Sequence, residues 1–164
     1  MLITRIISGC QTGVDRAAVD TAIELGIQHG GWVPKGRTAE DGELNHQYHV
    51  RETPSPDVNL RTEWNVRDSD ATLIISSGQL TGGSRFTQQM AHQYKRPLLH
   101  IDLVKLSIPE AVEQIIQWLY STQVGTLNIA GPRRSEDSEI YQRTKVLLRT
   151  VLLLGKIERY CPFC

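Results

Sequence analysis

A recurring pattern constrains the fold of this chain more than any other feature. Short apolar runs typical of strands are each followed by a turn, most often glycine-rich, and then by a segment with helical spacing. Alternating strands and helices form a parallel sheet that is covered on both faces and joined by right-handed crossovers. We expect strands at residues 2–8, 31–33, 71–76, 98–102 and 126–130, and helices at 14–25, 57–67, 84–94, from near Pro109, and at 137–154. The sequence therefore predicts one open, mostly parallel, Rossmann-like α/β sheet of about five strands, because a closed barrel would need about eight such units.

The size and charge of the chain limit the classes of protein to which it can belong. Its 164 residues fit a single domain, which we place at residues 1–155, with a tail at 156–164. Lys and Arg number 18 and Asp and Glu also number 18, whereas nucleic-acid-binding domains are usually basic. The most apolar stretch, residues 146–154, falls short of the roughly 20 residues of a membrane span, and the N-terminus lacks the order of a secretory signal. We therefore expect a cytoplasmic protein with no nucleic-acid and no membrane partner.

Three turns that follow expected strands share an unusual composition. They lie at residues 8–13, 76–84 and 130–135, and none spells a phosphate-loop or dinucleotide fingerprint. Loops that follow parallel strands gather at one edge of the sheet, where ligands bind. Glycine lets the backbone approach a ligand, and each turn opens a helix whose free N–H groups favour an anion. The pattern predicts an anion site at this edge, although glycine turns with Ser or Thr caps are also common structural features.

A polar segment, residues 35–56, separates the second expected strand from the next helix. Loops of that length inside a compact domain are uncommon and are usually functional. Lys35 and Arg37 bracket Gly36 at the start of this loop. They can contact a ligand or simply form an exposed, charged turn.

Four longer motifs give the chain a specific resemblance. They lie at residues 8–17 (SGCQTGVDRA), 30–42 (GGWVPKGRTAEDG), 61–72 (RTEWNVRDSDAT) and 128–133 (NIAGPR). From about residue 6 to about residue 154 the chain resembles the putative molybdenum carrier family. That family belongs to a Rossmann-like superfamily that includes the lysine-decarboxylase-like cytokinin phosphoribohydrolases. The resemblance implies a binding protein or carrier for a phosphorylated pterin, the molybdenum cofactor, or for a nucleotide-like ligand.

The resemblance also implies a set of ligand-binding positions in this sequence. The glycine turns would hold the phosphate group, and Arg16 and Lys35 would clamp it with positive charge. The third turn would close the far side. The implied positions are Gly9, Cys10, Gln11, Thr12, Gly13, Arg16, Lys35, Gly82, Gly83, Ser84, Gly131, Pro132 and Arg133.

The helix expected at residues 57–67 carries several functional groups at and just beyond its end. Asn65 and Asp68 are three residues apart, so both can face the pocket, where Asp68 would accept hydrogen bonds from a ring or a ribose. Trp64 can stack on that ring or lie in the core. Glu63 and Arg67 are four apart and can pair on the helix surface.

An alternative function is a nucleotide hydrolase, in which Glu63 or Asp68 activates water beside the phosphate clamp. The phosphoribohydrolases that the chain resembles carry two Glu residues shortly after a Gly-Gly turn. The matching positions here hold Gln88 and Gln89. A carboxylate pair suits acid–base cleavage of a glycosidic bond, so its absence argues against that particular activity.

The cysteines and histidines offer little metal chemistry. Cys10, where the family more often has glycine, could have a lowered pKa at a helix N-terminus, or it could be a small buried residue in a tight turn. Cys161 and Cys164 have metal or redox spacing but lack partner cysteines. The five histidines show no metal-binding spacing, so we expect no protein-bound metal site.

The last expected helix is apolar on more than one face over residues 146–154. The superfamily resemblance implies a homo-oligomer, a dimer or tetramer, in which such a helix could pair with its copy. A terminal helix buried on several sides within one monomer would explain the pattern equally well.

Overall fold

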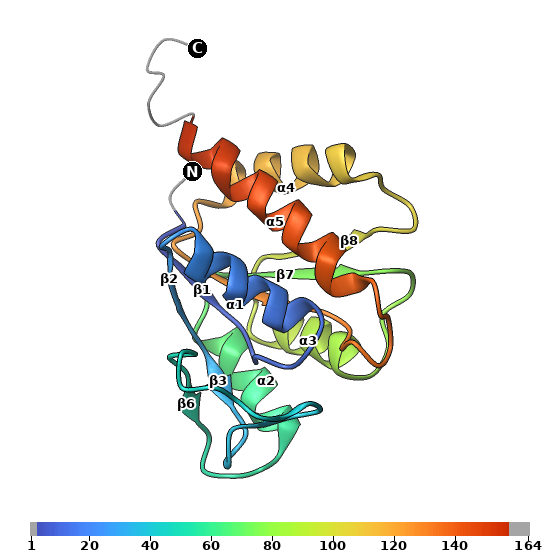
Figure 1. Ribbon diagram of the computed structural model, residues 1–164. Helices are drawn as coiled ribbons and strands as arrows, with labels where there is room; N and C mark the ends of the chain where they lie inside the picture. Colours follow the sequence, from blue (N-terminus) through green and yellow to red (C-terminus); the bar gives the residue numbers. More distant parts are fainter. Residues whose placement is uncertain (1–2, 158–164) are drawn as a thin grey trace.

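The computed structural model describes residues 3–157 and contains a central parallel sheet (Figure 1). The sheet has five strands in the order β2-β1-β9-β7-β8, and every pair of neighbours is parallel. The strands are β1 (Arg5–Ile7), β2 (Gln28–Gly30), β7 (Ala71–Ser76), β8 (Leu98–Asp102) and β9 (Thr126–Ala130). The predicted Rossmann-like α/β sheet of five strands is confirmed.

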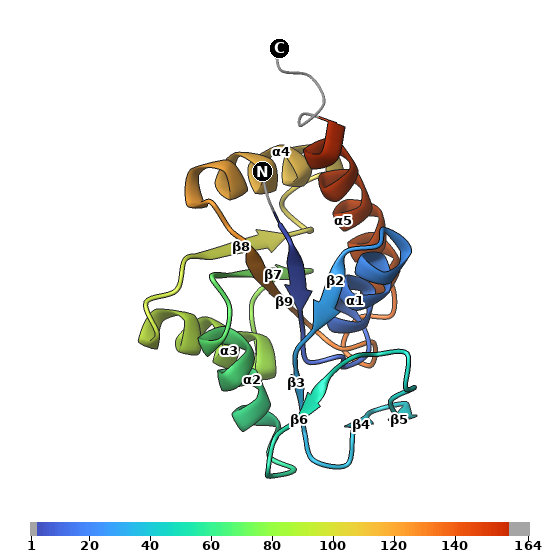
Figure 2. The ribbon, with the colours of Figure 1, turned by 90° about the vertical axis from the view of Figure 1, so that its left-hand side faces the viewer.

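Helices cover both faces of this sheet (Figure 2). One layer consists of α1 (Val14–Glu24), α4 (Ile108–Thr122) and α5 (Ile140–Ile157), and the other consists of α2 (Val58–Arg67) and α3 (Gly82–Gln93). The larger core lies under the first layer and joins strand residues such as Leu73 and Leu127 to helix residues such as Ile115 and Leu147. A smaller cluster around Val66 fills the space between α2 and α3. Since both faces are covered, the ligand-accessible region is left at the edge of the sheet.

The second expected strand differs from the prediction. The chain pairs with β1 earlier, through β2, and then turns at Gly31, whose φ of 130° favours glycine. A side chain at Gly31 would also lie 2.1 Å from the carbonyl oxygen of Ser8. Beyond this turn, β3 (Trp32–Val33) forms a separate two-stranded parallel sheet with β6 (Arg51–Glu52). The run at 31–33 is therefore not one strand of the main sheet.

The long polar segment has more structure than the predicted loop. It contains β4 (Thr38–Ala39) and β5 (Gly42–Glu43), which form a short antiparallel hairpin, followed by β6. We call residues 38–43 the acidic hairpin, because its tip carries Glu40 and Asp41. Isolated two-stranded hairpins are only marginally stable, so contacts with the rest of the protein must hold this one in place.

The apolar residues of α5 divide between the core and the surface. Leu147, Leu148, Val151 and Leu152 are buried, while Val146, Leu153 and Leu154 are exposed. Packing within one monomer, against α1 and α4, explains the buried residues, and a homo-oligomer stays a prediction. The helix reaches Ile157, past the domain boundary expected at 155, and the rest of the expected tail, with Cys161 and Cys164, lies outside the described residues. Within residues 3–157, no helix is long and apolar enough to cross a membrane.

Candidate functional site

A polar cavity lies where the three glycine turns meet α2, at the carboxyl end of the central strands. Its volume is about 50 Å³, and it opens to solvent. The first turn, the third turn, the N-terminal end of α3 and one face of α2 all contribute to its wall. The lining residues are Gly9, Gln11, Asp15, Arg61, Thr62, Asn65, Gly83, Ser84, Thr87, Asn128, Ala130, Gly131, Arg133 and Glu136.

The first and third turns are in backbone contact. Val14 N–H donates to the carbonyl oxygen of Pro132 at 3.2 Å. Gly13 has a φ of 78°, and a side chain there would lie 2.3 Å from that same oxygen. A side chain at Gly131 would lie 2.2 Å from the carbonyl oxygen of Ile75. These two turns therefore need glycine in order to pack, and their packing shapes one wall of the cavity.

A buried ion pair forms the centre of the cavity wall. Arg61 Nη1 donates to Asp15 Oδ2 at 3.0 Å, and the two side chains are 14% and 5% exposed. Burial raises the pKa of the Asp15 carboxyl, while Arg61 and the backbone N–H groups of Gln11 and Gly131 oppose that shift. The absence of a side chain at Gly9 makes room for the guanidinium, because a Cβ there would lie 1.3 Å from Arg61 Nη1.

The guanidinium of Arg61 retains hydrogen-bonding capacity. Its Nε is buried and has no hydrogen-bond partner among residues 3–157. The hydroxyl of Ser8 is likewise buried and has no hydrogen-bond partner among these residues. A buried polar atom without a partner costs free energy, so such atoms are often satisfied by a ligand or a water molecule. Asp15 fixes the position of the arginine from one side and leaves the rest of its planar fork for another group.

The N-terminal end of α3 supplies further donors. Its N-cap, Thr81, makes no side-chain cap hydrogen bond, and Gly82 and Gly83 are exposed. The first N–H groups of a helix lack intrahelical partners and carry partial positive charge. Ser84 and Thr87 follow on the side that lines the cavity. An anion placed here would meet backbone donors and hydroxyl groups together.

The third turn adds charges of both signs. Arg133 and Glu136 line the cavity, and Glu136 Oε2 accepts a hydrogen bond from Arg133 N–H at 3.0 Å. Asn128 lies in the floor, where its amide donates to the hydroxyl of Thr72 at 3.2 Å. The cavity therefore offers two guanidinium groups, several neutral donors and the exposed carboxylate of Glu136, which forms an ion pair with Arg133 Nε at 3.9 Å.

The structure brings seven of the fifteen expected binding residues into the lining of this cavity. Those that line it are Gly9, Gln11, Asn65, Gly83, Ser84, Gly131 and Arg133. Gly82 is next to it at the start of α3, and Pro132 faces a small neighbouring hollow with Ser84 and Glu136. The remaining positions have other surroundings.

The expected clamp of Arg16 and Lys35 is not assembled at this cavity. Arg16 forms a two-pronged ion pair with Asp41, with both N–O distances 3.1 Å, and its Nε donates to the carbonyl oxygen of Cys10. Together with Thr12 and Gly13 it lines a separate hollow on the other side of the first turn. Lys35 is exposed on the loop after β3.

The carboxylates proposed for a hydrolase also lie outside the cavity lining. Glu63 accepts a hydrogen bond from the hydroxyl of Tyr94 at 2.5 Å. Asp68 accepts from Arg67 Nε at 2.6 Å and from Trp32 Nε1 at 2.8 Å. Glu63 and Arg67 therefore do not form the surface pair that their spacing allows, because each has a different partner.

The aromatic residue of the same helix packs against protein. Trp64 is half-buried and makes an edge-to-face contact with Trp32, with ring centroids 4.7 Å apart. The guanidinium of Arg67 lies over its ring, 4.7 Å from the centroid. Trp64 is not among the residues that line the cavity.

Cys10 fits the structural interpretation and not the reactive one. It is fully buried with a φ of 52°, a conformation that explains why glycine would also suit this position. Burial, with a contribution from Asp15, raises the pKa of the thiol to about 12. The lowered pKa considered from its place near a helix N-terminus is wrong, because desolvation outweighs the helix dipole there.

Arg61 is absent from the residues that the sequence predicts for the site, although it begins one of the four motifs. Two signals could have found it. Arg61 and Asn65 are four apart, so they share a helix face. The first turn of α1 buries Asp15, and a buried carboxylate needs a cation or several donors. Both signals depend on knowing that α2 packs beside the first turn, which is a long-range contact.

The described residues offer no obvious metal site. Within residues 3–157, no group of three His, Cys, Asp or Glu side chains is arranged to hold a metal ion.

Comparison with known proteins assigns the chain to a family. Residues 6–152 match the circularly permutated YpsA SLOG family. The chain belongs to this family. It is also 55% identical to a crystallised putative molybdenum carrier protein from Syntrophus aciditrophicus SB, with a TM-score of 0.90 over 92% of this chain and 95% of that one. No curated protein sequence matches the chain.

Proposed function

We propose that the cavity binds a small phosphorylated ligand and that the protein is a carrier or binding protein. The observation that carries the proposal is the position of the Arg61 guanidinium. Buried Asp15 holds it over Gly9, and its Nε has no hydrogen-bond partner within residues 3–157. Arginine recognises phosphate through its planar fork, and the hydrogen bonds are strong because both groups are charged. The open N-terminal end of α3 supports an anion at the same place.

The name of the related crystallised protein suggests molybdenum cofactor as the ligand. The donor set of this cavity fits the phosphate of a phosphorylated pterin, through Arg61, Arg133 and the first turn of α3. No cysteine or histidine is among its lining residues. The cavity would therefore hold the cofactor by its phosphate, while the cofactor itself supplies all the metal chemistry. A nucleotide phosphate fits the same donors and is the alternative ligand.

The test is a binding titration with AMP and with a phosphorylated pterin, by calorimetry. Replacing Arg61 alone would leave Asp15 buried and unpaired, which costs about 3–5 kcal/mol of stability. The double variant Arg61→Met with Asp15→Asn removes both charges together. We expect it to fold and to bind either probe about 10- to 100-fold more weakly, since charge-assisted hydrogen bonds contribute about 1.5–3 kcal/mol.

A matched control is available on the same helix. Arg67 and Asp68 form another Arg–Asp ion pair, outside the cavity lining. The variant Arg67→Met with Asp68→Asn changes the same charges and should leave binding unchanged. Equal binding by the Arg61 variant and wild type would overturn the proposal, and weaker binding by the control alone would favour the site that the sequence predicts at Asp68.

A further inference from the structure

The main cavity is continuous with the neighbouring hollow between the second and third glycine turns. Ser84 and Glu136 line both spaces, so the two meet at these side chains. The hollow has a volume of about 100 Å³, compared with about 50 Å³ for the main cavity. Pockets that enclose a drug-sized molecule usually measure about 300–1,000 Å³. A ligand much larger than a phosphate group therefore has to extend from the cavity into this hollow.

Ser84 marks the junction with an unused hydroxyl. The residue is only 6% exposed, and its hydroxyl makes no hydrogen bond with any of residues 3–157. It belongs to the first turn of α3, beside the N–H groups that have no partners within the helix. A nearly buried hydroxyl without a partner is often satisfied by a ligand or a water molecule. The junction is therefore a place where a ligand atom is expected.

Glu136 brings a carboxylate to the same junction. Its Oε2 accepts the hydrogen bond from Arg133 N–H at 3.0 Å, and Arg133 Nε lies 3.9 Å away. Its Oε1 accepts no hydrogen bond from the described part of the chain, and a Cβ at Gly82 would lie 3.8 Å from it. The third turn thus holds one carboxylate oxygen. The other is a free acceptor at the start of α3.

This carboxylate limits which phosphorylated ligands suit the cavity. A phosphate ester carries between one and two negative charges near pH 7, and each arginine of the cavity already has a carboxylate beside it. Glu136 repels a bare anion bound nearby, because like charges at short range disfavour each other. It favours a ligand that brings a hydrogen-bond donor to Oε1. A hydroxyl group is such a donor and adds no charge.

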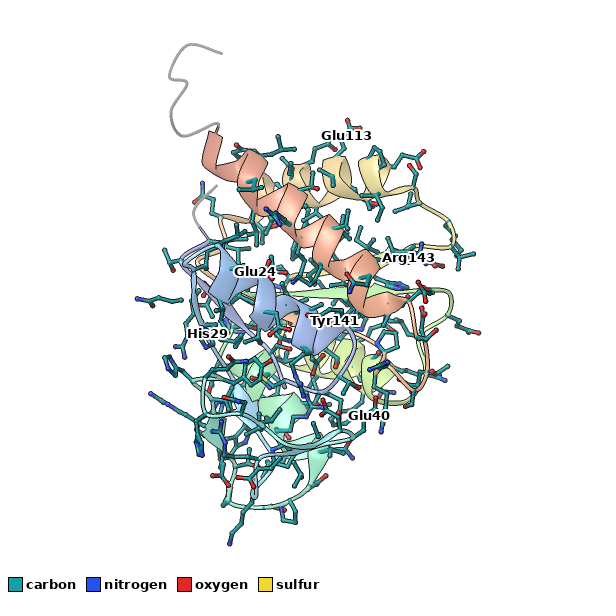
Figure 3. All side chains as sticks on the ribbon, in the orientation of Figure 1. Glu24, His29, Glu40, Glu113, Tyr141 and Arg143 are labelled. Carbon is teal, nitrogen blue, oxygen red and sulfur yellow. The ribbon has the colours of Figure 1, made fainter. Side chains whose placement is uncertain are left out.

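The other walls of the hollow suit hydroxyl groups as well. Arg143, labelled near the start of α5 in Figure 3, fixes the second turn by donating to the hydroxyl of Ser77 at 3.1 Å. The Gln79 amide and the Thr81 hydroxyl line the hollow and make no hydrogen bond within residues 3–157. Both side chains can donate and accept, as alcohol hydroxyls do. The hollow therefore combines a fixed wall with neutral groups that complement a polyol.

We propose that the ligand is a phosphate ester of a polyol, in which the phosphate binds beside Arg61 and the hydroxylated part lies in the neighbouring hollow. Glu136 accepts a hydrogen bond from one of the ligand's hydroxyl groups and so determines specificity. The Ser84 hydroxyl donates to the phosphate at the junction. The inference rests on the proposed function and narrows its ligand to an ester whose alcohol part carries hydroxyl groups.

The test compares glycerol 3-phosphate with propyl phosphate by calorimetry. The two esters share a three-carbon chain, and only the first carries free hydroxyl groups. Wild type should bind glycerol 3-phosphate about tenfold more tightly or better, because a hydrogen bond to a charged group is stronger than one between neutral groups. The variant Glu136→Gln should reduce this ratio to about threefold or less. All titrations contain EDTA, so that a metal ion held by Glu136 cannot create the preference.

Two further variants separate the charge from the contact. Glu139→Gln removes the same charge three residues further along, where the carboxylate lines neither space and accepts no hydrogen bond from residues 3–157. It should leave the ratio of the two affinities unchanged. Ser84→Ala should weaken both esters alike, by about 3- to 10-fold, since its hydroxyl faces the phosphate that they share.

The outcomes distinguish this inference from the proposed function. If AMP binds the Arg61 and Asp15 double variant as tightly as wild type, both are overturned. If that variant binds AMP weakly, while wild type binds the two esters alike or binds neither, the polyol inference alone is overturned. An unchanged ratio in Glu136→Gln would also overturn it. Tighter binding of phosphoethanolamine than of glycerol 3-phosphate would assign Glu136 to an ammonium group and would overturn the choice of a polyol.

Discussion

The first and third glycine turns differ from the second in what their glycines do. Side chains added at Gly13 or Gly131 would collide with backbone oxygens at 2.3 and 2.2 Å. Side chains added at Gly78 or Gly83 would meet no atom within 4 Å. One sequence signature therefore has two physical meanings. In the first and third turns, glycine allows two segments of backbone to touch. In the second turn, it leaves the N-terminal end of α3 open to solvent.

The two kinds of turn also have different roles in the cavity. The closed turns fix the shape of the wall and position the donors near Arg61. The open turn presents the first N–H groups of α3, which have no partners within the helix and no cap from the Thr81 side chain. A ligand would meet a rigid wall on one side and an accessible helix end on the other.

Thiol reactivity should show the largest contrast between the closed and open turns. In a background with Cys161→Ser and Cys164→Ser, Cys10 should react with iodoacetamide at pH 8 at least about 1,000-fold more slowly than a cysteine placed by Gly83→Cys. With its pKa raised to about 12, the thiol of Cys10 is almost wholly protonated at pH 8, whereas an exposed cysteine has an ordinary pKa of about 8.5. Mass spectrometry of the alkylated peptides measures both rates. Comparable rates would show that the first turn is open.

Stability should give the next largest contrast. Gly131→Ala places a methyl group 2.2 Å from the carbonyl oxygen of Ile75 and 2.5 Å from Val14 Cγ2. Neither the strand oxygen nor the buried valine can move easily, so we expect a loss of about 3 kcal/mol in the free energy of unfolding. Urea denaturation followed by circular dichroism measures it. A loss below about 1 kcal/mol would mean that the third turn tolerates a wider spacing than its contacts indicate.

The smallest effect is expected at the open turn, and with the opposite sign. Gly83→Ala adds a methyl group in open space within the first turn of α3. Alanine loses less backbone entropy than glycine in a helix, so the free energy of unfolding should rise by up to about 1 kcal/mol. The same urea titration tests it. Destabilisation comparable with that of Gly131→Ala would remove the distinction between the two kinds of turn.

The fold could be predicted from the sequence because its signals are local. Apolar runs, turn glycines and helical spacing each extend over a few residues, and the alternation of strands and helices leaves a parallel sheet as the consistent arrangement. The prediction of a strand at 31–33 in this sheet was wrong, because Gly31 lies against Ser8 and the chain turns out of the sheet there. That contact joins residues far apart along the sequence.

The site could be predicted only in part, for the same reason. The glycine turns were identifiable, since their composition is local. The partners of the charged residues were not, because Arg16 meets Asp41 and Arg61 meets Asp15 through tertiary contacts. The family resemblance implied Arg16 and Lys35 as the cations, whereas the buried arginine that lines the main cavity, Arg61, comes from α2. Side-chain direction, which the sequence does not show, decides between them.

The side-chain amide of Asn65 restricts how α2 can move relative to β3. It accepts a hydrogen bond from Trp32 N–H at 2.8 Å and donates to the carbonyl oxygen of Trp32 at 2.9 Å, as a neighbouring strand would. These two bonds fix the rotation and the axial position of α2 against β3. Arg61 lies one turn earlier on the same helix, so the same two bonds fix the position of its backbone, while Asp15 holds its guanidinium. A rigid-body shift or rotation of α2 would therefore have to break both bonds, so the wall that α2 contributes to the cavity keeps its place.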